Sequence, residues 1–276
     1  MKSINCRGRL IEFEQTKIMG ILNYTPDSFS DGGLFNTPSK ALSQIELMLQ
    51  EGADLIDIGA MSSKPKSTFL SSKEEKERLK PLLSEILKNF PNHIFSLDTF
   101  RSEIAEWAVE NYNISIINDI SAGELDSKMF QIIGKLQVPY IMMHMQGTPI
   151  NMQDQPQYNN ITQDIIQYFA NKINELKQYS VHDIIIDPGF GFGKTLEHNY
   201  QLLKELEQFE ILDKLLLIGV SKKSMIQNVL NSNSENSLNG TSIINTIAVE
   251  KGANILRVHN VKEAKEIIKI YSMITK

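Results

Sequence analysis

The chain has 276 residues, 41% of them hydrophobic and 22% charged, which is enough for one large α/β barrel or two smaller domains with a sizeable core. The net charge of −5 argues against a nucleic acid or anionic membrane as partner, although a local basic pocket could still bind an anion. The single cysteine, Cys6, fits a reducing compartment, and no apolar run has the length of a signal peptide or membrane span, so we expect a cytoplasmic protein.

Short apolar runs rich in β-branched residues alternate with segments of helical periodicity along the chain. The runs predict strands at Lys17–Leu22, Asp54–Ile58, Ile94–Leu97, Ser115–Asn118, Val138–Met143, Asp183–Asp187, Leu215–Val220 and Asn254–Val258. Apolar residues at three- and four-residue spacing predict helices at Ser39–Glu51, Lys73–Asn89, Ser102–Asn111, Ile161–Gln178, Leu196–Gln208 and Val261–Met273. Thr37-Pro38 and Ser71-Ser72 are candidate helix starts, and Gly52 and Gly252 are candidate helix ends.

Strand–helix alternation of this kind predicts parallel strands joined by right-handed crossovers. Eight units of about 35 residues predict a closed (β/α)8 TIM barrel that forms a single domain over residues 1–276; an open doubly wound sheet is the alternative. The polar tract Asn231–Asn239 is too short for a linker and should divide the seventh helix, with a new helical segment at Ser242–Val249. Residues 1–16 should form a hairpin that covers the bottom of the barrel.

Two predicted loops, residues 23–37 and 59–72, follow the first two strands. Both are longer than the usual βα connection of about two to six residues. Extra length on the catalytic face of a barrel is typical of loops that cover a substrate, so we expect both to be active-site loops.

The stretch Ile184–Lys194 ends a buried strand on a carboxylate, Asp187, and continues into a glycine-rich turn. Neither the Walker A spacing nor the dinucleotide-binding spacing of glycines is present, because Pro188 and Lys194 stand where glycine would be required. The glycines are therefore interpreted as allowing another group to approach the backbone of this loop closely. Asp187 is the candidate functional residue of the stretch.

Every predicted strand ends on, or runs directly into, residues able to contact a ligand, at the barrel face where active sites lie. These residues are Asn23, Asp57, Asp98, Asn118-Asp119, Met143-His144, Asp187, Ser221-Lys222-Lys223 and Arg257-Val258-His259. Helix capping explains any one of them about as well as ligand binding does, but it does not readily explain all eight. Asp57 is either a direct contact or a group that supports one, and Asp119 could equally bond a neighbouring loop.

The residue types at these strand ends divide into two kinds. Asp98, Asn118 and Asp187 could converge on a planar heterocycle, since carboxylates accept from ring N–H groups and an amide both donates and accepts. Arg257, His259 and a cation held by Asn23 would suit a polyanion such as diphosphate. The five histidines show no zinc spacing, and no Gly-x-Ser-x-Gly elbow supports a serine nucleophile.

At these residues the chain resembles the dihydropteroate synthase family over nearly its whole length. The resemblance is carried, in order along the chain, by Met19–Gly33, Ser96–Thr99, Ile117–Ile120, Met142–Gly147, Ile184–Lys194, Ser221–Ser224 and Leu256–His259. It implies condensation of 6-hydroxymethyl-7,8-dihydropterin diphosphate with 4-aminobenzoate, giving 7,8-dihydropteroate and diphosphate in folate synthesis. It also implies a transferase that needs no protein nucleophile, is a target of sulfonamides and forms a homodimer through helices of the later half of the barrel.

The resemblance also implies roles for individual residues. Asp98, Arg257 and Lys223 are the expected catalytic groups, and Asn23 is the expected Mg²⁺ ligand. The pterin diphosphate site comprises Ser63, Asp98, Asn118, Met143, Asp187, Phe192, Lys223, Arg257 and His259. The 4-aminobenzoate pocket comprises Phe29, Pro65, Lys223 and Ser224.

The chain departs from the family pattern mainly in the second loop, which reads Asp57-Ile-Gly-Ala-Met-Ser-Ser-Lys-Pro-Lys66. Lys64 keeps the charge but loses the planar fork of the usual arginine, so its contacts to diphosphate are in doubt. Met61 replaces a carboxylate, Lys66 replaces a glycine, and Lys222 replaces an arginine.

Two other functions remain open at this point: a pterin-binding methyltransferase acting with a cobalamin protein, and a paralogue that binds pterin without turnover. Away from the strand ends we expect ordinary structural roles. Trp107 should pack a helix on the barrel, and the charged run Lys73–Arg78 should be a solvated helix face.

Overall fold

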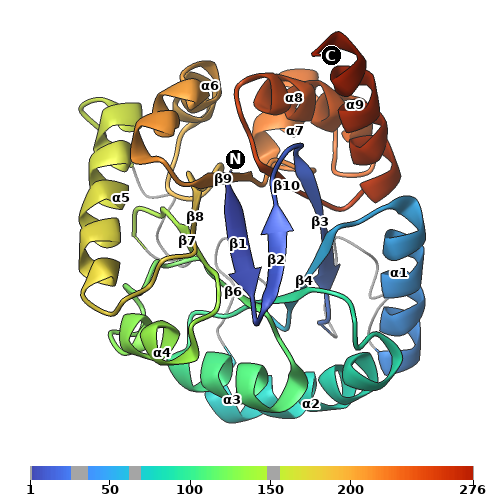
Figure 1. Cartoon of the computed structure of the whole chain (residues 1–276). Coiled ribbons are helices and arrows are strands. Elements are labelled where there is room, and N and C mark those ends of the chain that lie inside the picture. Colours follow the sequence, from blue (N-terminus) through green and yellow to red (C-terminus); the bar gives the residue numbers. More distant parts are fainter. Residues whose placement is uncertain (1, 26–36, 62–69, 148–155, 276) are drawn as a thin grey trace.

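The computed structural model describes residues 2–25, 37–61, 70–147 and 156–275. Within these residues, eight parallel strands close into a barrel in the order β10-β3-β4-β5-β6-β7-β8-β9 (Figure 1). The barrel strands are β3 (Lys17–Asn23), β4 (Leu55–Gly59), β5 (Phe95–Asp98), β6 (Ile116–Asp119), β7 (Tyr140–Met143), β8 (Ile184–Asp187), β9 (Leu215–Ile218) and β10 (Ile255–Val258). The predicted TIM barrel is confirmed, and the alternative of an open sheet is excluded because β10 pairs with both β9 and β3.

Helices surround this barrel on the outside (Figure 1). They are α1 (Pro38–Glu51), α2 (Ser72–Asn89), α3 (Ser102–Tyr112), α4 (Met129–Leu136), α5 (Ile161–Lys177), α6 (Leu196–Lys204), the 3₁₀ helix η1 (Leu206–Leu212), α7 (Ser224–Leu230), α8 (Leu238–Glu250) and α9 (Val261–Ile274). In the described part of the chain, none of them combines the length and apolarity that crossing a membrane requires.

The predicted helix boundaries rest on capping groups that the structure contains. The Thr37 side chain accepts from the backbone N–H of Lys40, and Ser71 forms a reciprocal capping box with Glu74. Gly52 ends α1 in the left-handed region at φ 101°, where a residue with a Cβ would be strained.

The sequence prediction missed α4 and placed the start of α8 too late. In α4, Gly134 lies against residue 179, where an added Cβ would come within 2.6 Å of the Tyr179 carbonyl oxygen. Helix α8 begins at Leu238 and includes Gly240, whose missing side chain admits Ile226 and Leu230 of α7. Both helices therefore contain a glycine that is required for close packing, although glycine lowers helix propensity.

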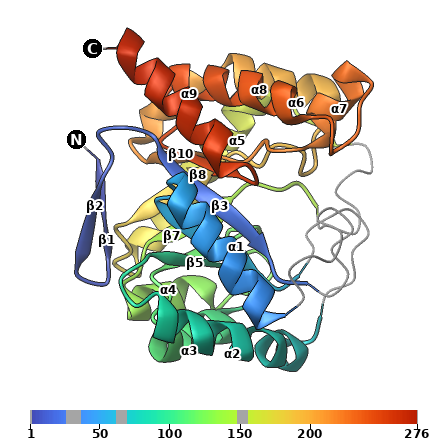
Figure 2. The ribbon, with the colours of Figure 1, turned by 90° about the vertical axis from the view of Figure 1, so that its right-hand side faces the viewer.

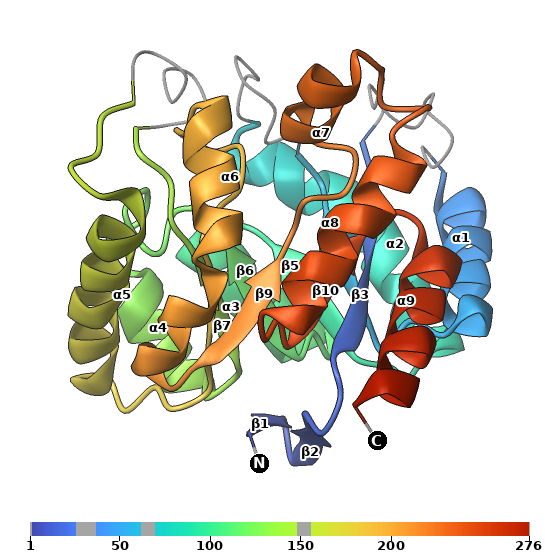
Figure 3. The ribbon, with the colours of Figure 1, turned by 90° about the horizontal axis from the view of Figure 1, so that it is seen from above.

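The amino-terminal hairpin, β1 (Ser3–Cys6) and β2 (Arg9–Glu12), lies at one end of the barrel, with the barrel strands directed toward the other end (Figures 2 and 3). Its two-residue turn is Arg7-Gly8, both with positive φ, as a tight hairpin requires. Ile4, Cys6 and Phe13 pack against the inward-facing residues near the strand starts, including Met19 and Ile185. The hairpin thus seals the barrel interior with apolar contacts at the end opposite the strand-end polar groups.

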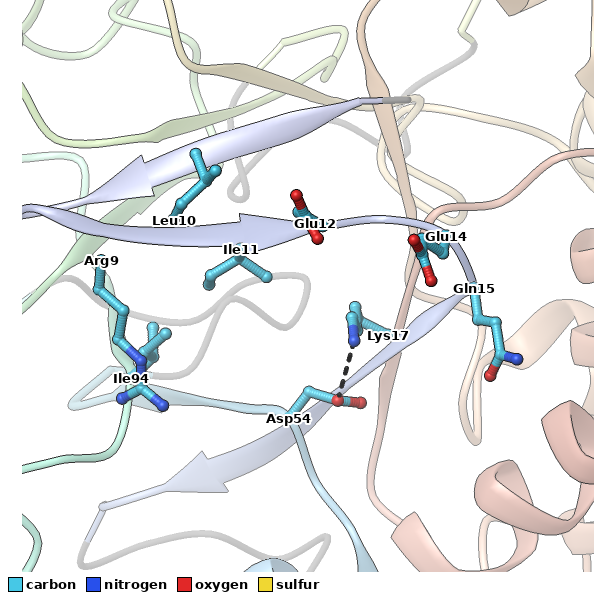
Figure 4. Close-up of a pocket in the computed structure, with 9 residues that line it drawn as sticks. All are labelled: Arg9, Leu10, Ile11, Glu12, Glu14, Gln15, Lys17, Asp54 and Ile94. Atoms are coloured by element: carbon cyan, nitrogen blue, oxygen red, sulfur yellow. Dashed lines mark ion pairs between the residues drawn. The ribbon is translucent and has the colours of Figure 1, made fainter.

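A polar hollow of about 540 Å³ lies beside the hairpin, between β2 and the starts of β3, β4 and β5. Figure 4 shows Lys17 and Asp54 paired across its floor, and their nitrogen–oxygen distance is 3.6 Å. Asp54 also accepts from the backbone N–H of Ile18, so this pair fixes the start of β3 beside β4. The hollow is therefore on the face of the barrel away from the strand ends.

Cys6 provides a direct test of how closely the hairpin covers the barrel. Its burial raises the pKa of the thiol to about 12, so little thiolate is available for reaction in the native state. We expect native protein at pH 8 to react with a disulfide reagent at least about a hundredfold more slowly than protein in guanidinium. Equal rates would show that the hairpin does not stay on the barrel, and Ile4→Ala should accelerate the native reaction.

Candidate active site

Asp57, at the carboxyl half of β4, connects three strands of the barrel. Its side chain is fully buried, and its Oδ2 accepts from Asn118 Nδ2 of β6 at 2.9 Å and from Arg257 Nε of β10 at 2.8 Å. Asp57 therefore orients two of the predicted site residues. The bond from Nδ2 directs the amide oxygen of Asn118 away from Asp57, where it can accept from a ligand.

Arg257 forms a second ion pair, with Asp98 at the end of β5. Its Nη2 lies 2.7 Å from Asp57 Oδ2 and 3.2 Å from Asp98 Oδ2. Burial and the neighbouring Asp57 charge raise the pKa of the Asp98 carboxyl, and the Arg257 guanidinium opposes this increase. The arginine is held in one orientation by two carboxylates, as recognition of an anion by a planar guanidinium requires.

The second cluster is built around Asp187 at the end of β8. Its Oδ1 accepts from the backbone N–H of Gly189 at 2.8 Å, and burial raises the pKa of the carboxyl while the nearby Lys223 charge lowers it. The Lys223 ammonium donates to the Phe190 carbonyl and lies 4.6 Å from the centre of the Phe192 ring. Burial lowers the pKa of Lys223 to about 8, against the attraction of Asp187.

These two clusters adjoin. Gly219, which follows β9, has no side chain between them; a Cβ there would lie 3.9 Å from Arg257 Cβ and 4.0 Å from Asp187 Oδ2. Met143 pairs in register with Asp187 and is buried beside it. The strand ends therefore form one continuous polar surface with an apolar side at Met143 and Phe192, as a planar heterocycle would require.

The remaining predicted residues within the described ranges lie around this surface. His259 follows β10 and contacts Ser221 Oγ through both its backbone N–H, at 3.3 Å, and its ring Nδ1, at 3.0 Å. Ser224 is exposed at the start of α7, next to Lys223. Asn23 ends β3, in register with Gly59 of β4. Phe29, Ser63, Pro65, Lys64 and Lys66 lie outside the described residues.

Asp119 and Glu75 have structural roles. Asp119 binds the loop after β6: its carboxylate accepts from Ser121, from the backbone N–H of Gly123 and from the Tyr140 hydroxyl. Glu75 corrects the prediction that Lys73–Arg78 is a solvated face, because its side chain is fully buried on α2. It accepts from Thr99 Oγ1 at 2.8 Å and forms an ion pair with Arg101.

Arg101 lies next to Met61, which stands where the family usually has a carboxylate. One guanidinium nitrogen lies 3.5 Å from Met61 Sδ, and the other donates to the Leu70 carbonyl. Arg101 therefore joins the described residues on either side of 62–69, and a carboxylate at position 61 would stand within reach of it. In this chain Glu75 is the counter-charge of Arg101. Burial raises the pKa of Glu75, and the contacts with Thr99 and Arg101 lower it in part.

A family model described as "Pterin binding enzyme" matches residues 19–259. The chain is 39% identical over 265 residues to the dihydropteroate synthase of Haemophilus influenzae, a match that covers 95% of each. The chain belongs to the dihydropteroate synthase family of pterin binding enzymes.

Solved structures agree with this family assignment. The Yersinia pestis dihydropteroate synthase in a sulfonamide drug complex has a TM-score of 0.95 and 36% identity, covering 99% of each chain. The dihydropteroate synthase of Xanthomonas albilineans in complex with 7,8-dihydropteroate has a TM-score of 0.88 and 29% identity, also covering 99% of each chain. The dihydropteroate synthase likeness therefore extends over the whole barrel and the hairpin.

Substituting Glu75 tests the buried pair against a matched exposed residue of the same helix. Glu75→Gln should destabilise the fold by about 3–5 kcal/mol, because Arg101 would be left without its counter-charge. Glu77, which approaches Lys73 at 3.9 Å with both side chains largely exposed, is the control. Urea unfolding should show Glu77→Gln unchanged; equal midpoints for the two variants would contradict a structural role for Glu75.

Proposed function

We propose that this chain condenses 6-hydroxymethyl-7,8-dihydropterin diphosphate with 4-aminobenzoate, giving 7,8-dihydropteroate and diphosphate in folate synthesis. The observation that carries the proposal is the placement of Arg257 between Asp57 and Asp98, directly beside the Asp187–Lys223 cluster. Anion-binding and heterocycle-binding groups thus adjoin at one end of the barrel. Family membership supports the same reaction, since the Haemophilus relative is a dihydropteroate synthase.

The pterin ring would be recognised by groups whose orientation is already fixed. Asp187 is held by Gly189 and faces Lys223, so its carboxylate can accept from the ring N–H and the amino group. The Asn118 amide is held by Asp57, and Met143 and Phe192 provide apolar contact with the ring faces. Because these groups are ordered before binding, little conformational entropy is lost when the ring is bound.

The reaction would be a substitution at the pterin methylene carbon. The bond between that carbon and the diphosphate oxygen breaks, the amine nitrogen of 4-aminobenzoate forms the new bond, and the amine proton is released. The electron-rich dihydropterin favours substantial cleavage before attack, so the demand on the protein is to stabilise the departing diphosphate. Arg257 and His259 are the groups proposed for that task, and Asp98 helps to fix the orientation of Arg257.

We also propose that Asn23 binds Mg²⁺ together with oxygens of the diphosphate. The donor set fits a hard cation: from the position of a Cβ at Gly59, Asp98 Oδ2 would lie at 3.7 Å and Asn23 Oδ1 at 3.9 Å. One carboxylate oxygen of Asp57, Oδ1, is buried without a hydrogen-bond partner in the structure. The part of the chain that the structure describes holds no group of three or more His, Cys, Asp or Glu suited to a metal, so the substrate would supply most ligands. When bound, the ion would neutralise charge on the leaving group.

The 4-aminobenzoate pocket is proposed at Lys223 and Ser224, where α7 begins, with Phe29 and Pro65 from the two long loops. The exposed Ser224 and the neighbouring Lys223 ammonium offer a hydroxyl and a positive charge to the benzoate carboxylate. A sulfonamide, which resembles 4-aminobenzoate, would compete at the same place.

A cytoplasmic homodimer is also proposed. Large apolar side chains are exposed on helices of the later half of the barrel, among them Val229 and Leu230 of α7, Ile243 of α8 and Ile270 of α9. A second copy of the chain would cover such a surface. Sedimentation equilibrium should give twice the chain mass, and Ile243→Asp should give a monomer.

The function is tested by diphosphate release. With the pterin diphosphate, 4-aminobenzoate and Mg²⁺ we expect steady release of diphosphate and formation of 7,8-dihydropteroate, both reduced by a sulfonamide and by removal of Mg²⁺. Binding of the pterin without release would identify a paralogue that lacks turnover. Methyl transfer from a folate to a corrinoid, without diphosphate release, would instead support the methyltransferase alternative.

Substituting Asp187 tests how the ring is recognised. Asp187→Ala should weaken pterin binding in calorimetry by at least about tenfold, because ring donors would be left unpaired at about 1–3 kcal/mol or more. The control is Asp183, which precedes the same strand and accepts from the backbone N–H of Asn5 at 3.0 Å near the hairpin. Asp183→Ala should bind pterin normally; near-normal affinity of Asp187→Ala would refute the assignment.

A further inference from the structure

Lys194 is a buried lysine to which the proposed reaction gives no role. It follows the glycine-rich turn after β8, and its residue surface is 3% exposed. Its Nζ lies 3.1 Å from His144 Nδ1, 3.4 Å from the His144 carbonyl and 2.9 Å from the Phe192 carbonyl. Burial lowers the pKa of Lys194 well below its usual range, so the fold bears a cost for keeping an amine there.

These contacts join two loops that meet backbone to backbone. An added Cβ at Gly189 would lie 2.0 Å from the His144 carbonyl oxygen, and one at Gly193 would lie 2.6 Å from the Gln146 carbonyl oxygen. Both glycines also have positive φ. The glycines therefore allow the loop after β8 to lie directly on the loop after β7, and Lys194 bonds to both loops where they touch.

Two further side chains, one half-buried and one buried, bond to the same turn. The Tyr158 hydroxyl donates to the Gly193 carbonyl at 2.8 Å, and Asn199 Oδ1 of α6 accepts from the Gly191 backbone N–H at 2.7 Å. The rings of Tyr158 and Tyr168 pack around His144, at centroid distances of 6.0 and 4.9 Å. The backbone of residues 189–193 is thus fixed by side chains other than those proposed to bind the pterin.

The turn fixed in this way includes Phe190 and Phe192, the two residues that contact the Lys223 ammonium. Lys223 donates to the Phe190 carbonyl and lies over the Phe192 ring, while Lys194 donates to the Phe192 carbonyl. A change in the backbone at Phe192 would move the ring, the carbonyl and the Lys223 ammonium together. Asp187 and Arg257 are the charged groups that act most strongly on Lys223, and Lys194 itself interacts electrostatically with both Asp187 and Lys223.

We propose that Lys194 is a positioning residue for the pterin site: it sets the backbone of residues 190–192 and, through Phe190 and Phe192, the place of the Lys223 ammonium. The part of this proposal that concerns pterin binding depends on the function proposed above. The part that concerns Lys223 holds for the protein without substrate.

The test uses Lys194→Met, which keeps the length of the side chain and removes its hydrogen bonds, in the full-length protein. The pKa of Lys223 is measured from the pH dependence of its acetylation by mass spectrometry, and pterin diphosphate affinity by calorimetry. We expect the pKa of Lys223 to rise from about 8 toward the ordinary 10.5, because a displaced ammonium regains water. Pterin affinity should fall by about tenfold to a hundredfold, as for other small displacements of site groups.

Lys172→Met is the matched control. This lysine of α5 is also largely buried, but its partners are Glu124, at 2.6 Å, and the Phe130 and Tyr168 rings rather than the backbone of residues 189–193. It should leave both the Lys223 titration and pterin affinity unchanged. Tyr158→Phe separates displacement of Lys223 from the loss of the Lys194 charge, and it also decides the case if Lys194→Met does not fold, because it removes one bond to the same turn without changing any charge. A smaller shift of the pKa of Lys223 in the same direction supports the proposal.

Lowered thermal stability of Lys194→Met with an unchanged Lys223 titration and unchanged pterin affinity would overturn the proposal, as would an unmoved titration in Tyr158→Phe. The titration requires no substrate. Failure of the native protein to release diphosphate would therefore count against the proposed reaction and leave the role of Lys194 to be judged by Lys223 alone.

Discussion

The arrangement of the site depends on one buried ion pair, between Asp57 of β4 and Arg257 of β10. Strands β4 and β10 both pair with β3, so the pair spans that strand inside the barrel. Asp57 also holds the Asn118 amide, and Arg257 also holds Asp98, so four strand ends are oriented through one contact. Removing one partner of such a pair leaves the other as an uncompensated charge. Burying these charges costs desolvation free energy, but it fixes the orientation of the Arg257 guanidinium before an anion binds.

The second half of the site is organised by backbone proximity. The turn after β8 can lie on the turn after β7 only because residues 189 and 193 are glycines. That contact places the Phe190 carbonyl and the Phe192 ring beside Lys223, and the resulting desolvation lowers the pKa of the lysine. A lysine with a pKa of about 8 is partly deprotonated near physiological pH, whereas one with the ordinary value of 10.5 is almost entirely protonated.

Much of this site could be predicted from the sequence, because strand period and strand-end polarity are local features. Eight apolar runs, each ending at or beside polar residues, were enough to predict the barrel and to predict that Asp98, Asn118, Asp187 and Arg257 lie at the same end of it. Glu75 was wrongly predicted to be solvated because it lies in a run of charged residues. It stands four residues before Leu79, however, and so lies on the apolar face of α2. Lys194 and Arg101 depend on contacts between segments distant in the sequence, which no local pattern reveals. The binding and catalytic roles of all the site residues remain predictions, and Phe29, Ser63 and Pro65 lie outside the described residues.

The measurement that tests this account most directly is a double-mutant cycle at Asp57 and Arg257, read as the rate of diphosphate release with 4-aminobenzoate. If Asp57 acts by holding Arg257, then Asp57→Asn and Arg257→Met should each slow release. The double variant should then be no slower than Arg257→Met alone. Additive losses would contradict the account, because they would show that Asp57 acts through Asn118 or on the substrate itself and not through the arginine.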